Sequence, residues 1–130
     1  MVILDTNIWY AYLSEDDYRH VRAENVFETM DDDILIPEYV LSELCSLLAR
    51  KKRKDSADRF IELAESNEHV ELLPSSPQFF SEVRSRFQSI QSSRLSFVDV
   101  ALIVLSHSIR VYTFDATLYK HLKSRTAKAP

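Results

Sequence analysis

The chain has 130 residues, of which 45% are hydrophobic, and its formal net charge is −4, from 16 basic and 20 acidic side chains. This length and composition predict one domain, residues 1–130, with a substantial hydrophobic core. The acidic balance is not the usual footprint of a nucleic-acid-binding domain, and the lack of glycine argues against glycine-rich phosphate-binding loops. A single cysteine and no apolar run near the ~18 residues of a membrane span predict a cytoplasmic protein.

Short apolar runs alternate along the chain with longer amphipathic segments. The predicted strands are residues 2–5, 34–36, 70–73 and 111–114. The predicted helices are residues 8–13, 18–30, 38–52, 56–66, 77–90, 96–108 and 116–123. Short apolar strands separated by helices favour an α/β fold with a mainly parallel sheet, covered by helices on both faces as a three-layer α/β/α sandwich.

Four acidic residues stand at positions that are unusual for a charge. Asp5 ends the first predicted strand and Asp115 follows the last, Glu43 lies beside the apolar stripe of helix 38–52, and Asp99 is the only charge in a strongly apolar stretch. Ligands of parallel sheets bind beyond the carboxyl ends of the strands, where neighbouring connections leave in opposite directions. If the first and fourth strands are neighbours, we expect Asp5, Asp99 and Asp115 to meet there.

Each acid also has a structural alternative. Asp5 and Asp115 are suited to capping the helices that follow them, and Ser96 with Asp99 fits a capping box. Glu43 fits a partly exposed helix position at the border of the stripe. For any one acid taken alone, these alternatives stay open.

The four acids together favour a metal site. Two carboxylates 4 Å apart repel by about 4 kcal/mol at an effective dielectric near 20, so a cluster of four needs protons or cations. Oxygen ligands without histidine or cysteine favour Mg²⁺ or Mn²⁺ over zinc. We therefore predict that Asp5, Glu43, Asp99 and Asp115 bind a divalent ion.

Cations gather in one short run, residues 50–54. A run of this kind either complements the dipole at the end of a helix or contacts phosphates. The second interpretation makes Arg50, Lys51, Lys52 and the later Arg94 candidate phosphate-contacting residues.

Four short motifs occur in a particular order: Asp5-Thr6-Asn7, Ser42-Glu43-Leu44, Ser96-Phe97-Val98-Asp99 and Thr113-Phe114-Asp115. With these motifs the chain resembles PIN-domain nucleases, and in particular the small VapC toxins of toxin–antitoxin pairs. The resemblance implies a Mg²⁺-dependent endoribonuclease that leaves 5′-phosphate and 3′-hydroxyl ends. It also implies a homodimer, and an antitoxin whose C-terminal segment lies over the active-site groove. The acidic quartet Asp5, Glu43, Asp99 and Asp115 would hold the metal and be catalytic, with Thr6, Asn7 and Thr113 as supporting polar neighbours. The candidate phosphate-contacting cations would then bind RNA.

The chain departs from the family pattern in two ways. Members often have a fifth strand after the last helix, and here only residues 124–130 remain for it. Glycine, which is usual in such proteins, is missing.

Three other functions remain compatible with the residues. One is a free-standing RNA-processing nuclease of the same family, and another is a PIN-like module that binds RNA without cutting it. A Mg²⁺-dependent phosphohydrolase or phosphotransfer domain is the third, although haloacid-dehalogenase-like enzymes carry a second aspartate where this chain has Asn7.

Overall fold

The computed structural model describes residues 1–123, in which helices and strands alternate as the sequence predicts. Along the chain the elements are β1 (Val2–Leu4), α1 (Thr6–Leu13), α2 (His20–Thr29), β2 (Ile34–Pro37), α3 (Glu38–Arg50), α4 (Lys54–Ser66), β3 (Val70–Leu73), α5 (Pro77–Ser89), α6 (Phe97–Leu105), β4 (Arg110–Tyr112) and α7 (Ala116–Tyr119).

The strands form a four-stranded sheet in the order β3-β2-β1-β4, and every pairing is parallel. Val2 aligns with Ile34 of β2 on one side and with Arg110 of β4 on the other. The first and fourth strands are therefore neighbours, which is the condition under which Asp5 and Asp115 emerge side by side.

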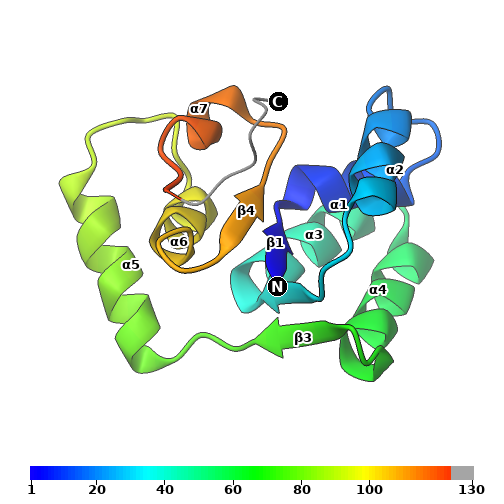
Figure 1. Cartoon of the computed structure of the whole chain (residues 1–130), viewed down its shortest axis with the longest axis horizontal. Coiled ribbons are helices and arrows are strands. Elements are labelled where there is room, and N and C mark those ends of the chain that lie inside the picture. The colour runs from blue at the N-terminus through cyan, green and yellow to red at the C-terminus, as the bar shows by residue number, and fades with distance from the viewer. Residues whose placement is uncertain (124–130) are drawn as a thin grey trace.

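Helices cover both faces of the sheet (Figure 1). The path runs from β1 to β2 to β3 in one direction and then returns to β4 on the far side of β1. Because crossovers between parallel strands are right-handed, this reversal puts α1 to α4 on one face and α5 and α6 on the other. Contacts agree, since α1 packs on α2 and α3, α3 on α4, and α5 on α6. The predicted three-layer α/β architecture is confirmed.

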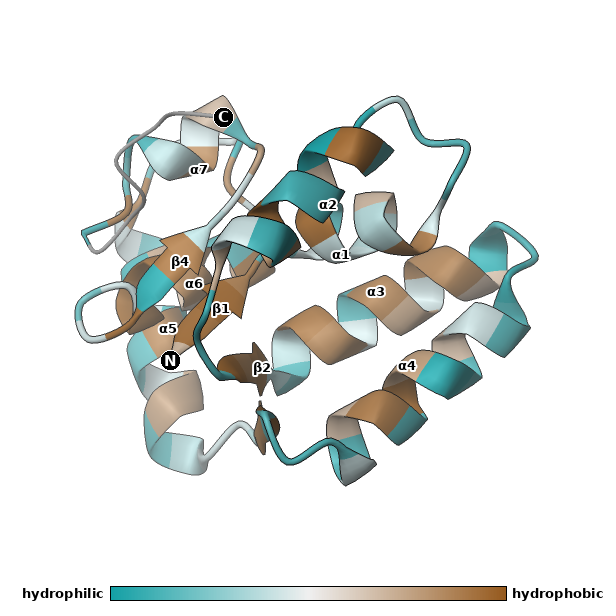
Figure 2. Ribbon diagram, turned by 45° about the vertical axis from the view of Figure 1, so that its right-hand side comes forward, coloured by the Kyte–Doolittle hydropathy of each residue, from teal (hydrophilic) through white to brown (hydrophobic). Residues whose placement is uncertain are grey.

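The core is built on the two central strands, β1 and β2, whose ribbons are hydrophobic (Figure 2). Ile3, Leu4 and Ile36 are fully buried. On the face covered by α1 to α4, Trp9 makes edge-to-face contacts with Phe27 and Phe60, at centroid distances of 5.2 and 4.9 Å. These contacts fix α1 against α2 and α4 and so help to hold the turn at Asp5, between β1 and α1, in place.

Several predicted boundaries are wrong by a few residues, and the reasons are local hydrogen bonds. Helix α2 begins at His20 and not at residue 18, because Asp17 accepts a hydrogen bond from the Arg19 backbone N–H in a turn. Strand β4 ends at Tyr112 and not at residue 114, because the Phe114 N–H donates to the Asn7 side chain.

The apolar helix predicted at residues 96–108 ends at Leu105, where the chain turns to enter β4. The last helix is a single turn, Ala116–Tyr119, and the turn after it buries Leu122. A fifth strand would fall in residues 124–130, which lie outside the described residues. Over residues 1–123, no helix is long and apolar enough to span a membrane.

Candidate active site

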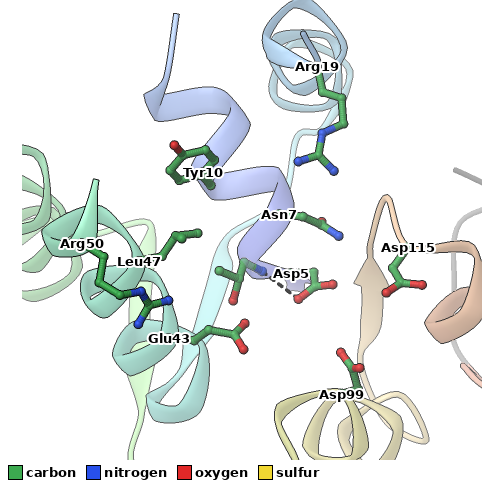
Figure 3. Close-up of a pocket in the computed structure, with 10 residues that line it drawn as sticks. Asp5, Asn7, Tyr10, Arg19, Glu43, Leu47, Arg50, Asp99 and Asp115 are labelled. Atoms are coloured by element: carbon green, nitrogen blue, oxygen red, sulfur yellow. Dashed lines mark hydrogen bonds between the residues drawn. The ribbon is translucent and has the colours of Figure 1, made fainter. Parts of the chain in front are cut away.

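A cavity of about 340 Å³ opens at the carboxyl ends of β1 and β4, and all four predicted acids line it. They come from different elements: Asp5 precedes α1, Glu43 lies in α3, Asp99 lies in the first turn of α6, and Asp115 precedes α7. Figure 3 shows Asp99 and Asp115 pointing toward Asp5 from the opposite side of the cavity. The other lining residues are Thr6, Asn7, Tyr10, Arg19, Leu47 and Arg50.

Asp5 is the most buried of the acids, with 5% of its surface exposed. Its Oδ1 accepts a hydrogen bond from the Thr6 backbone N–H and its Oδ2 from the Thr113 hydroxyl, both at 2.7 Å. Burial raises the pKa of Asp5 from 3.8 to about 7, with contributions from the negative charges of Asp99 and Glu43, although the two hydrogen bonds oppose the shift. A proton or a cation at Asp5 therefore stabilises the folded protein near neutral pH.

Thr113 joins the ends of β1 and β4. Its hydroxyl donates to Asp5 Oδ2 and accepts from the Asp115 backbone N–H at 3.0 Å and from Asn7 Nδ2 at 3.4 Å. Asn7 Oδ1 in turn accepts from the Phe114 N–H at 3.2 Å. The predicted supporting residues Asn7 and Thr113 thus form one network that fixes Asp5 and Asp115 relative to each other. Thr6 joins it through its backbone N–H.

Asp99 and Asp115 cap helices and face the cavity at the same time. Asp99 Oδ2 accepts from the Ser96 N–H at 2.9 Å in the predicted capping box, and Asp115 Oδ1 accepts from the N–H groups of Thr117 and Leu118. The other oxygen of each carboxylate has no donor among residues 1–123. The capping alternatives are confirmed, and they do not compete with a role in the cavity.

Aromatic packing brings α3 and α6 together and so places Glu43 near Asp99. Tyr39, one turn before Glu43, contacts the ring of Phe97 at 5.7 Å between centroids, and Phe97 lies two residues before Asp99. Burial raises the pKa of Asp99, and the negative charges of Asp115 and Glu43 raise it further. The hydrogen bonds with Ser96 oppose this shift. The three carboxylates act on one another electrostatically across the cavity.

The donor chemistry of the cavity fits a hard divalent cation. Its charged acceptors are carboxylates, and no histidine or cysteine is among the lining residues. Within the part of the chain that the structure describes, no three or more His, Cys, Asp or Glu side chains converge closely enough to hold a metal. The acids thus surround a common space without closing on one point.

Of the predicted RNA-binding cations, only Arg50 lines the cavity. Lys51 and Lys52 are exposed just beyond α3, and Arg94 is exposed in the loop before α6. Sequence reasoning missed Arg19 and Tyr10. Arg19 follows an irregular turn and reaches the cavity through the packing of α2 on α1, for which no local sequence signal exists.

Residues 2–123 match the PIN domain family. This chain is a PIN-domain protein. The match covers nearly the whole chain and includes all four acids of the cavity, in agreement with the motifs from which the resemblance was predicted.

Solved structures show the same fold in toxins of toxin–antitoxin pairs. VapC20 of Mycobacterium tuberculosis, a toxin that cleaves the sarcin–ricin loop, superposes on this PIN-domain protein with a TM-score of 0.81 at 20% identity, covering 91% of this chain and 92% of that one. A toxin–antitoxin complex from Klebsiella pneumoniae matches with a TM-score of 0.69 at 13% identity, covering 98% and 97%. FitAcB from Neisseria gonorrhoeae matches with a TM-score of 0.66 at 17% identity, covering 96% of this chain and 95% of that one. No curated protein sequence matches the chain.

Proposed function

We propose that this PIN-domain protein is a divalent-metal-dependent endoribonuclease and the toxin of a toxin–antitoxin pair. The observation that carries the proposal is the cavity in which Asp5, Glu43, Asp99 and Asp115 meet, around a buried aspartate whose pKa is raised to about 7. Family membership and the fold shared with VapC toxins support nuclease chemistry at this site.

The cavity resembles a site prepared for Mg²⁺ or Mn²⁺. Asp5 and Asp99 would be the main ligands, and Glu43 and Asp115 would complete the set or hold a second ion more weakly. Small side-chain rotations would be needed, since the carboxylates stand apart in the structure. When bound, the metal supplies Lewis-acid activation of water and neutralises charge on the phosphodiester.

The protein's own residues would orient the reaction. The Thr113 hydroxyl and the Thr6 N–H hold both oxygens of Asp5, so this ligand is pre-organised and loses little side-chain entropy on binding. Asn7 and Thr113 keep Asp115 at the same edge of the cavity. Water would add to phosphorus and the bond to the 3′-oxygen would break, giving a 5′-phosphate and a 3′-hydroxyl.

Cations near the cavity would draw RNA toward an otherwise repulsive acidic site. Arg50 lines the cavity itself. Lys51, Lys52 and Arg94 are exposed outside it and would contact the strand farther from the cleavage point.

The proposal includes two protein partners. A structure of similar fold is a toxin–antitoxin complex, which supports an antitoxin partner for this chain. We expect the antitoxin's C-terminal segment to cover the cavity. A second copy of the chain is the other expected partner, and light scattering of the purified protein tests for a homodimer. Co-expression with the product of an adjacent short reading frame tests the antitoxin, and fractionation of cells tests the expected cytoplasmic location.

The decisive experiment is cleavage of a labelled RNA by metal-free protein, with Mg²⁺, with Mn²⁺ and with EDTA. Asp5→Asn and Asp99→Asn should abolish cleavage, while Asp31→Asn, a change at an exposed acid before β2, should not. Cleavage that persists in EDTA or in Asp5→Asn would contradict the assignment.

The same preparations separate the alternatives. A non-catalytic RNA-binding module would bind RNA without cutting it in any metal, and a phosphohydrolase would release phosphate from a monoester substrate instead. A free-standing processing nuclease would cut RNA but would not arrest growth when expressed alone.

A further inference from the structure

Arg19 is a cation on the wall of the acidic cavity. We propose that Arg19 binds a phosphate of the RNA strand inside the active site, so that the strand is held between this guanidinium and the acidic cluster. The inference rests on the proposed function, since it names how that site recognises its substrate.

The side chain of Arg19 is held in place from several sides. Its Nε lies 3.5 Å from Asp17 Oδ1, and the same oxygen accepts a hydrogen bond from the Arg19 backbone N–H at 2.8 Å. The guanidinium carbon lies 5.7 Å from the centroid of the Phe114 ring and 5.1 Å from that of Tyr18. Stacking and ion pairing of this kind restrict the guanidinium before any ligand arrives.

Arg19 faces the acids without pairing with them. No ion pair within 4.0 Å joins it to Asp5, Glu43, Asp99 or Asp115, all of which are described residues. Figure 3 shows its amino groups directed toward the space between Asn7 and Asp115. Its Nε is buried, and although it lies within ion-pair distance of Asp17, it makes no hydrogen bond in the structure. A positive group held apart from a negative cluster leaves room for an anion between them once cations neutralise the acids.

The shape of a guanidinium suits this ligand. Arginine presents parallel N–H groups that bind two oxygens of one phosphate, and such charge-assisted bonds are stronger than neutral ones. Hydrogen bonds aimed at oxygens that gain charge in the transition state also accelerate the reaction. Arg19 is therefore expected to affect turnover as well as binding.

Arg22 provides a matched control. It lies in the first turn of α2, three residues after Arg19, and its guanidinium carbon lies 4.4 Å from the centroid of the same Phe114 ring. Its side chain is exposed and does not line the cavity. Arg19→Gln and Arg22→Gln each remove one positive charge near the start of α2 and one contact with the Phe114 ring. They differ in access to the cavity.

The first test measures kcat and KM for RNA cleavage in Mg²⁺. Arg19→Gln should lower kcat/KM by about 100-fold, with part of the loss in kcat. Arg19→Lys, which keeps a charge beside Asp17, should fall between Arg19→Gln and the wild type, and Arg22→Gln should stay within about threefold of the wild type. Thermal melting should show Arg19→Lys folded, which separates a substrate role from a structural one.

A second test does not require cleavage. With Ca²⁺, a hard cation that can neutralise the acids, in place of Mg²⁺, fluorescence anisotropy of a labelled single-stranded RNA should show weaker binding to Arg19→Gln than to the wild type. The slope of log affinity against log salt should shrink by about 1. Equal losses in the two glutamine variants, or an Arg19→Gln enzyme within about threefold of the wild type in both assays, would overturn the inference. A wild-type protein that binds RNA through Arg19 but never cuts it would instead overturn the proposed nuclease activity.

Discussion

The two halves of the sheet's carboxyl edge are built differently. Beyond β1 and β4, Asp5 is buried and is bonded to Thr113, 108 positions away in the chain. Beyond β2 and β3, the acid is Glu38, which is exposed and accepts the Ser75 backbone N–H at 2.9 Å. The cavity near Glu38 is lined mainly by the apolar residues Leu41, Leu72, Leu73 and Pro74.

The difference shows what makes a carboxylate functional in this fold. Glu38 is solvated and satisfied by a neutral donor, so its charge costs little. Asp5 is buried at the point where the sheet order reverses, and this burial, with the nearby charges of Asp99 and Glu43, raises its pKa to about 7. Only the second arrangement stores electrostatic free energy that a bound cation can release.

The largest difference between the two halves is expected when Asp5 and Glu38 are each replaced by the corresponding amide. Asp5→Asn keeps the hydrogen-bonding shape but removes the charge that would hold the metal, so RNA cleavage should fall by about 1,000-fold or more. Glu38→Gln should retain wild-type rates. Single-turnover cleavage assays in Mg²⁺ measure both, and a comparable loss in the two variants would refute the distinction between the halves.

Metal binding should stabilise the folded protein through the half that contains Asp5 and not through the half that contains Glu38. At a Mg²⁺ or Mn²⁺ concentration of about 100 times Kd, the free energy of unfolding should rise by about 2.7 kcal/mol. The gain should largely disappear in Asp5→Asn and persist in Glu38→Gln. Thermal melts over a metal titration provide the measurement, and an unchanged melting temperature in the wild type would count against a metal at this cavity.

The pH dependence of the metal-free protein should reveal the same asymmetry. The pKa of Asp5 is raised when the chain folds, so the folded state holds the proton more tightly than the unfolded state does. Its stabilising contribution is complete below about pH 4 and is lost as pH rises through about 7. As the pH rises from 5 to 8, the free energy of unfolding of Asp5→Asn should increase by about 2 kcal/mol relative to that of the wild type. Urea unfolding in EDTA at several pH values measures this, and parallel curves would contradict it.

The smallest expected effect compares two hydroxyl groups. Thr113→Val leaves Asp5 Oδ2 and the Asp115 N–H without their partner, at a cost of about 1–2 kcal/mol in stability. Tyr39→Phe removes a hydrogen bond of 2.8 Å to Ser75 in the other half and should cost about 0.5–1 kcal/mol. Chemical denaturation ranks the two, and a reversed order would show that the Thr113 network is not the more tightly built one.

Much of the fold could be predicted because the signals are local. Apolar runs correctly located every strand of the described sheet, and the Ser96–Asp99 pair correctly marked the start of α6. Where boundaries failed, as at Phe114 and Arg19, hydrogen bonds to Asn7 and Asp17 decided them. The roles of the four acids as metal ligands and of Lys51, Lys52 and Arg94 in RNA binding remain predictions.

The sequence by itself determined which acids stand at strand ends and helix starts, because hydrophobic periodicity and capping chemistry depend on near neighbours. The tertiary structure decided that β1 lies beside β4, that Tyr39 packs on Phe97, and that Arg19 reaches the cavity. These contacts depend on how distant segments pack. Only that packing buries Asp5 and gathers the separately capped carboxylates around it, and burial together with the neighbouring charges raises the pKa of Asp5.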